Sequence, residues 1–157
     1  MKTRRVVLLL LISSFLLTGK IFAFLDHPTN HYQLRTPDKA EVYNYSGDQQ
    51  SRVISKPLKN PLRVQVLDSE NQPVSGVAIS FKLISQPQGA EGFIIDNKVV
   101  YTNSRGIAKT SVVLGNEPGN YEVAASIRNS ANNELLVYSF SARKPNWGVF
   151  LVTGLLG

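Results

Sequence analysis

Apolar and polar residues alternate with a period of two in one segment of this chain after another, and this pattern constrains the fold more than any other feature. Successive side chains of a β-strand point to opposite faces, so the pattern predicts strands with one buried face. Its clearest occurrence spans residues 77–84, where four apolar side chains share one face: Val77, Ile79, Phe81 and Leu83. Further strands are predicted over residues 62–66, 93–95, 98–102, 108–114, 121–127 and 134–142.

These strands together predict an all-β architecture of two antiparallel sheets, because each sheet needs the other to cover its apolar face. Turn-forming residues separate the strands, and a chain of 157 residues holds one such domain with a targeting segment. Tyr121 is expected either to fill the core or to form a tyrosine corner, in which its hydroxyl bonds to upstream backbone. The structural core is predicted to contain Val64, Val66, Val77, Ile79, Phe81, Leu83, Ala108, Val112, Leu114, Tyr121, Val123 and Ala125.

An ordered series of short motifs over residues 46–142 is similar to a known domain family. The motifs are Ser46-Gly47-Asp48-Gln49-Gln50; Leu58, Pro61, Leu62, Val64, Val66 and Asp68; Pro73, Val74, Gly76, Val77, Ile79 and Phe81; Thr102, Asn103, Gly106 and Ala108; and Leu114, Gly115, Gly119, Tyr121, Val123 and Ala125. The series resembles the bacterial immunoglobulin-like domains of the invasin and intimin type (group 1). Asn71-Gln72 departs from the pattern, because the family more often has a glycine-containing turn there.

The resemblance implies an immunoglobulin-like antiparallel β-sandwich of about seven strands, with residues 46–50 as its opening strand. Domains of this type serve as spacers, stalks or binding platforms in surface-exposed or periplasmic proteins and carry no catalytic residues. Only one copy is present, so a stalk of stacked copies is not expected.

Residues 1–23 have the layout of a secretory signal. Basic residues precede an apolar run over residues 6–17, and Ala23 offers a cleavage site. If the segment is not cleaved, it is long enough to serve as a signal-anchor helix. In either case the basic flank predicts that the chain after about residue 25 is exported, to the periplasm or the cell surface. Residues 24–45 are polar and contain prolines, which predicts an extended lead-in to the sandwich.

Four of the basic residues that give the chain its formal net charge of +6 lie in this amino-terminal segment. Setting aside Lys2, Arg4, Arg5 and Lys20 leaves 13 basic residues against 11 acidic ones, with no basic run interleaved with aromatics. Nucleic acid is therefore not expected as a partner. The chain has no cysteine, which excludes disulfides, thiolate chemistry and a lipidated cysteine anchor.

The tail, residues 143–157, ends in an uncharged apolar run that begins at Trp147. Eleven helical residues would span about 16 Å, roughly half of a hydrocarbon core. Three interpretations are open: an interfacial anchor, a strand or dimer contact, or the first half of a membrane helix. The third is favoured, because residues 148–157 resemble the entry to the first membrane helix of sodium/phosphate cotransporter-like proteins.

No catalytic, cofactor or metal site is predicted. The only histidines, His27 and His31, lie with Asp26 and Asp38 in the proline-containing lead-in, which indicates solvated side chains more than a metal site. Four acidic residues lie in or beside turns and could either bind calcium or cap the turns: Asp48, Asp68, Glu70 and Asp96. Capping of the turns is favoured. No Ser-His-acid set or phosphate-binding loop can be assembled.

The sequence thus predicts a non-catalytic, extracytoplasmic module of the bacterial cell envelope that is associated with the membrane through its amino-terminal segment. It would act as an adhesin-like binding or spacer domain for an unidentified protein or envelope partner. The alternative is the exported amino-terminal domain of a truncated cotransporter-like membrane protein.

Overall fold

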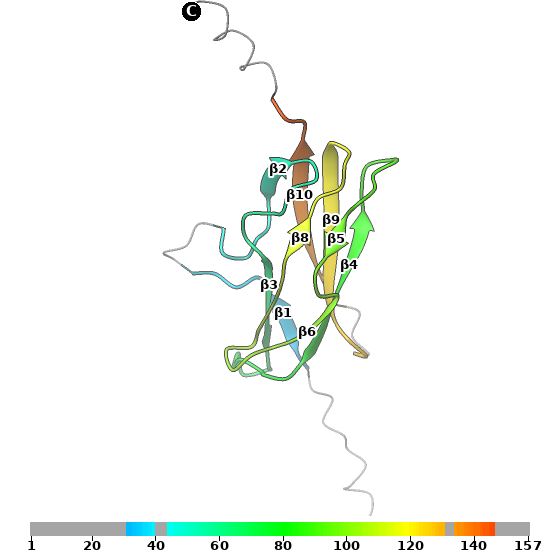
Figure 1. Ribbon diagram of the computed structural model, residues 1–157. Coiled ribbons are helices and arrows are strands. Elements are labelled where there is room, and N and C mark those ends of the chain that lie inside the picture. The colour runs from blue at the N-terminus through cyan, green and yellow to red at the C-terminus, as the bar shows by residue number, and fades with distance from the viewer. Residues whose placement is uncertain (1–30, 40–43, 131–133, 147–157) are drawn as a thin grey trace, which may run out of the picture. The chain divides into compact units, whose positions relative to one another are not determined.

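The computed structural model describes residues 31–39, 44–130 and 134–146, and the regular elements of these residues are all β-strands (Figure 1). The predicted signal segment and the apolar run from Trp147 lie outside the described residues. The strands are β1 (Gln33–Arg35), β2 (Gln50–Val53), β3 (Leu62–Leu67), β4 (Ala78–Ser85), β5 (Ile94–Ile95), β6 (Val99–Tyr101), β7 (Ile107–Thr110), β8 (Val112–Val113), β9 (Gly119–Ile127) and β10 (Leu135–Arg143).

Two sheets form the layers of a β-sandwich. One has the strand order β1-β3-β7 and the other the order β2-β10-β9-β4-β6, while β5 and β8 form a separate two-stranded ribbon. All pairings are antiparallel except that of β2 with β10. In Figure 1 β3 lies apart from β10, β9 and β4, which run alongside one another. The chain crosses repeatedly between the sheets, as in immunoglobulin-like sandwiches.

The core lies between the two sheets and is built from the alternate residues that the period-two pattern predicts. Eleven of the twelve predicted core residues are buried, and Phe81, Tyr121 and Tyr138 are among the largest fully enclosed side chains. Leu83 is half-buried and packs against the edge of the core. It stands where the pairing of β4 with β9 shifts register, next to an open depression.

The predicted strand over residues 108–114 is divided into two. Its first part, β7, pairs with β3, and its second part, β8, pairs with β5. The alternation persists through the break, so Ala108, Thr110, Val112 and Leu114 are all buried. The Thr110 hydroxyl donates to the carbonyl of Asn97 at 3.0 Å and accepts from its amide at 3.2 Å, so this polar side chain can be enclosed.

The amino-terminal part of the domain differs from the prediction in two ways. Residues 46–50 do not form the opening strand; a turn occupies residues 44–46 and β2 begins only at Gln50. Gly47 has φ +82°, outside the extended region, and glycine is needed there because a Cβ would lie 2.2 Å from the Pro61 carbonyl oxygen. In addition, β1 lies within the predicted lead-in, where it pairs with β3 and buries Leu34.

Candidate functional site

A groove on the outer face of the three-stranded sheet is the candidate functional site. The register of β3 and β7 sets Arg63 opposite Lys109 and Gln65 opposite Ile107. The alternating partners Val64 and Ala108 are buried in the core. Arg63, Gln65, Ile107 and Lys109 therefore stand on the outward face of the sheet.

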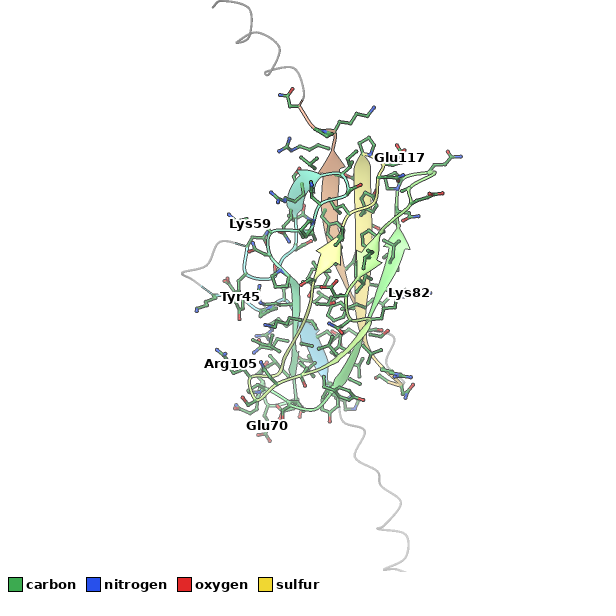
Figure 2. The ribbon with its side chains drawn as sticks, viewed as in Figure 1. Tyr45, Lys59, Glu70, Lys82, Arg105 and Glu117 are labelled. Carbon is green, nitrogen blue, oxygen red and sulfur yellow. The ribbon has the colours of Figure 1, made fainter. Side chains whose placement is uncertain are left out.

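The groove has a volume of about 310 Å³ and is bordered by the end of β6, the turn that follows it and the loop before β2. Tyr45 and Arg105 project from the same side of the domain in Figure 2, whereas Lys82 projects from the opposite side. We call this surface the basic groove; its lining residues are Tyr45, Arg63, Val100, Tyr101, Asn103, Arg105, Ile107 and Lys109.

Arg63 is held in place by Tyr45. The centre of its guanidinium lies 4.4 Å from the Tyr45 ring centroid, a cation–π geometry. One of its terminal nitrogens, Nη1, also donates to the Tyr45 backbone carbonyl at 2.6 Å. These contacts fix the side chain and leave other N–H groups of the guanidinium available to a ligand.

The turn between β6 and β7 places Arg105 at the groove. Asn103 Oδ1 accepts hydrogen bonds from the backbone amides of Arg105 at 2.9 Å and Ile107 at 3.1 Å. Gln65 Nε2 donates to the Arg105 carbonyl at 3.1 Å. The turn therefore presents a cation beside the outer face of β3 and β7.

The basic groove carries three cations, and its lining contains no carboxylate. Like charges directly opposite each other on neighbouring strands destabilise a sheet, and Arg63 and Lys109 form such a pair. A concave surface with charge of one sign concentrates counter-ions of the other sign. The arrangement is therefore suited to bind an anionic ligand.

A second depression of about 370 Å³ adjoins the basic groove and shares Tyr45, Arg105 and Ile107 with it. It adds Lys39 and one carboxylate, Asp38, from the segment after β1. The two depressions form one extended surface, so a ligand that occupies both must be longer than a single small ion.

Tyr138 supports the basic groove from inside the core. Its hydroxyl donates to the carbonyl of Arg63, which ties the strand that carries the arginine to β10 in the other sheet. Burial raises the pKa of Tyr138 above the ordinary value, and the Asp48 carboxylate adds to the shift. The phenol therefore stays protonated and keeps its donor.

Tyr121 fulfils both roles considered for it. The side chain is fully buried, and its hydroxyl donates to the Glu117 carbonyl four residues upstream at 2.7 Å, the geometry of a tyrosine corner. Desolvation is the main cause that raises the pKa of Tyr121. Its ring stacks on Phe93 at 5.5 Å between centroids, which closes one end of the core.

Two of the four acidic residues weighed for calcium, Asp48 and Asp68, accept hydrogen bonds from backbone amides. Asp68 Oδ1 accepts from the amides of Glu70 and Gln72, both at 2.9 Å, and Asp48 Oδ1 accepts from the amide of Ser139 at 2.8 Å. Within the described ranges, no three His, Asp or Glu side chains are grouped closely enough to hold a metal ion. His27 and Asp26 of the lead-in lie outside these ranges.

The basic groove could not be found by scanning for basic runs, because Arg63 is more than forty residues away in the sequence from Arg105 and Lys109. A weak signal does exist: Arg63 and Lys109 both occupy polar positions of alternating strands. Only the strand register shows that they face each other.

The structure thus defines an all-β, immunoglobulin-like sandwich module with a basic surface groove. Comparison with known protein families found no match, and no curated protein matches either. No helix among the described residues has both the length and the apolar character needed to span a membrane.

Solved structures that this chain resembles include domains of intimin. The D00-D0 domain of intimin is 15% identical over 62% of this chain and 44% of its own, with a TM-score of 0.47. A C-terminal fragment of intimin in complex with the intimin-binding domain of the translocated intimin receptor is 19% identical over 59% of this chain and 30% of its own, with a TM-score of 0.42. A PapD-like domain of human CEP192 is 12% identical over 77% and 90%, with a TM-score of 0.36.

This chain therefore spans less than half the length of the intimin structures that it matches. Intimin domains are thus among the solved structures that this chain resembles, each at less than 20% identity. The resemblance of the tail to cotransporter-like proteins stays a prediction.

Proposed function

We propose that this chain is a non-catalytic, extracytoplasmic module of the bacterial cell envelope, associated with the membrane, that binds an envelope component or protein partner in an adhesin-like manner. The observation that carries the binding role is the pair of like charges at Arg63 and Lys109 on the floor of the basic groove. Two cations that face each other lower the stability of the sheet. We expect such a pair to be retained where a bound anionic ligand neutralises the two charges.

The location is supported by the signal layout of residues 1–23 and by the tail. The chain can be anchored in two ways, which differ in the amino terminus of the mature protein. An intact amino terminus makes the segment a signal anchor, whereas cleavage after Ala23 leaves attachment to the tail or to a partner.

Membrane fractionation of the expressed 157-residue chain, followed by an alkaline-carbonate wash and amino-terminal sequencing, tests this proposal. We expect the chain in the envelope fraction and accessible to protease added to spheroplasts. A chain that remains in the cytoplasm, protected from that protease, would contradict the proposed function.

A further inference from the structure

We infer that the basic groove binds an acidic polysaccharide, a chain of sugars that bears carboxylate groups. This inference deepens the proposed binding function and rests on it. It is argued from three properties of the groove: its charge, its aromatic side chains and its position on the face of a sheet.

The charge selects an anion. Arg63, Arg105 and Lys109 line one depression, and the adjoining one adds Lys39 together with one carboxylate, Asp38, so cations outnumber carboxylates over the two. Guanidinium groups bind carboxylates through paired N–H donors, and an ammonium adds a point charge. The spread of these cations over two connected depressions suits acid groups repeated along a chain.

The aromatic side chains select a ligand with flat, partly apolar faces. Tyr101 is 66% exposed at the rim of the groove. One face of the Tyr45 ring is already covered by Arg63. A phenol ring offers an apolar body and a polar tip, so it can pack against the C–H face of a sugar while cations bind the acid groups.

The position of the groove disfavours an acidic peptide. Peptides that bind to sheets usually pair their backbone with an exposed strand edge. The floor of this groove is instead the outer face of β3 and β7, where side chains project and the two backbones pair with each other. β6 and β7 are also edge strands of their sheets, so pairing of a peptide backbone at the rim of the groove is the alternative that the comparison with poly-L-glutamate tests.

The inference is tested by measuring the binding of polygalacturonate to the full 157-residue chain, purified in detergent. Dextran serves as the uncharged polysaccharide, poly-L-glutamate as the acidic peptide and a single-stranded oligonucleotide as another polyanion. We expect saturable binding of polygalacturonate that weakens as salt is added, since screening reduces attraction between exposed charges. Dextran should not bind, and the other two polyanions should bind more weakly.

Two pairs of variants locate the site. Removing two cations of the groove, Arg105→Gln with Lys109→Gln, should weaken polygalacturonate binding by about tenfold or more. The matched control, Lys82→Gln with Lys98→Gln, removes two cations from a different depression and should leave binding unchanged. Tyr101→Ala should weaken polygalacturonate binding but not poly-L-glutamate binding, whereas Val137→Ala, at an exposed position of β10 outside the groove lining, should change neither.

Several results would overturn the inference. The first is the absence of saturable binding of polygalacturonate. The second is an equal loss of polygalacturonate affinity in the groove variant and in the control variant. The third is that poly-L-glutamate or the oligonucleotide binds as tightly as polygalacturonate and that Tyr101→Ala has no effect on polygalacturonate binding. The groove variant is expected to fold, because it relieves repulsion between cations. An exported chain that fails to bind polygalacturonate contradicts this inference alone, whereas a cytoplasmic chain that binds it contradicts only the proposed location.

Discussion

At the scale of single residues, the hydroxyl of Tyr121 offers the cleanest test of the packing described here. Tyr121→Phe leaves the ring in the core but removes the donor to the Glu117 carbonyl. We expect the free energy of unfolding to fall by about 1–2 kcal/mol, because a partly buried acceptor loses its partner. Thermal denaturation measures the effect, and Tyr101→Phe on the surface is the control. Equal melting temperatures for the two variants would contradict the tyrosine corner.

Phe81 tests the register of the sandwich. Its side chain is 2% exposed on the inner face of β4, while the next residue, Lys82, is exposed on the outer face. Phe81→Asp places an unpaired charge in the core, so we expect it to abolish folding, whereas Lys82→Asp should be tolerated. Limited proteolysis of both variants distinguishes them. A protease-resistant Phe81→Asp variant would mean that β4 faces the other way.

At the scale of elements, the turn between β6 and β7 depends on Gly106. This residue has φ +69°, and a Cβ there would lie 2.5 Å from the Val66 carbonyl oxygen. Gly76 has a similar φ of +77° but open space around it. We expect Gly76→Ala to cost about 1–2 kcal/mol from backbone conformation alone. Gly106→Ala should cost more, because the backbone of β3 must also move; urea unfolding of both variants compares them.

The pairing of β3 with β7 predicts an unusual response at Lys109. Lys109→Gln removes one of two like charges that face each other across the strands. We expect it to raise the free energy of unfolding by about 0.2–1 kcal/mol at low salt, and the gain should shrink in high salt. Lys82→Gln is the matched change on the other sheet. A Lys109→Gln variant that is less stable than wild type would show that the lysine has a structural role.

The elements also show where sequence reasoning succeeds and where it fails. The alternation of apolar and polar residues correctly predicted that residues such as Ile79 and Val123 are buried. The two-residue period of a strand can be read from residues that are close in the sequence. It did not predict β1, because three residues are too few to show a period and the strand depends on pairing with β3 and on burial of Leu34. The basic groove was missed for the same reason, since its cations meet only through pairing between distant segments.

At the scale of the whole molecule, two buried tyrosines make the stability of the fold depend on pH, and one of them, Tyr138, links the two sheets. The Tyr138 hydroxyl ties β10 to the carbonyl of Arg63 on β3, across the core. Burial raises the pKa of both Tyr138 and Tyr121 above the ordinary value of 10.0. The folded state therefore keeps both phenols neutral at a pH where the unfolded chain begins to lose these protons.

The sign of the pH dependence follows from this difference. Below pH 10 both states hold the phenol protons, so the contribution of these groups to stability is fully present. As pH rises above 10, the unfolded state binds fewer protons than the folded state, and the free energy of unfolding falls. The slope approaches about 1.4 kcal/mol per pH unit for each proton retained. Urea unfolding at pH 8, 9, 10 and 11 measures it, and Tyr138→Phe should reduce the slope. If the slope of the Tyr138→Phe variant equals that of wild type, the phenol of Tyr138 is not enclosed between the sheets, and the support it gives to Arg63 and the basic groove is lost with it.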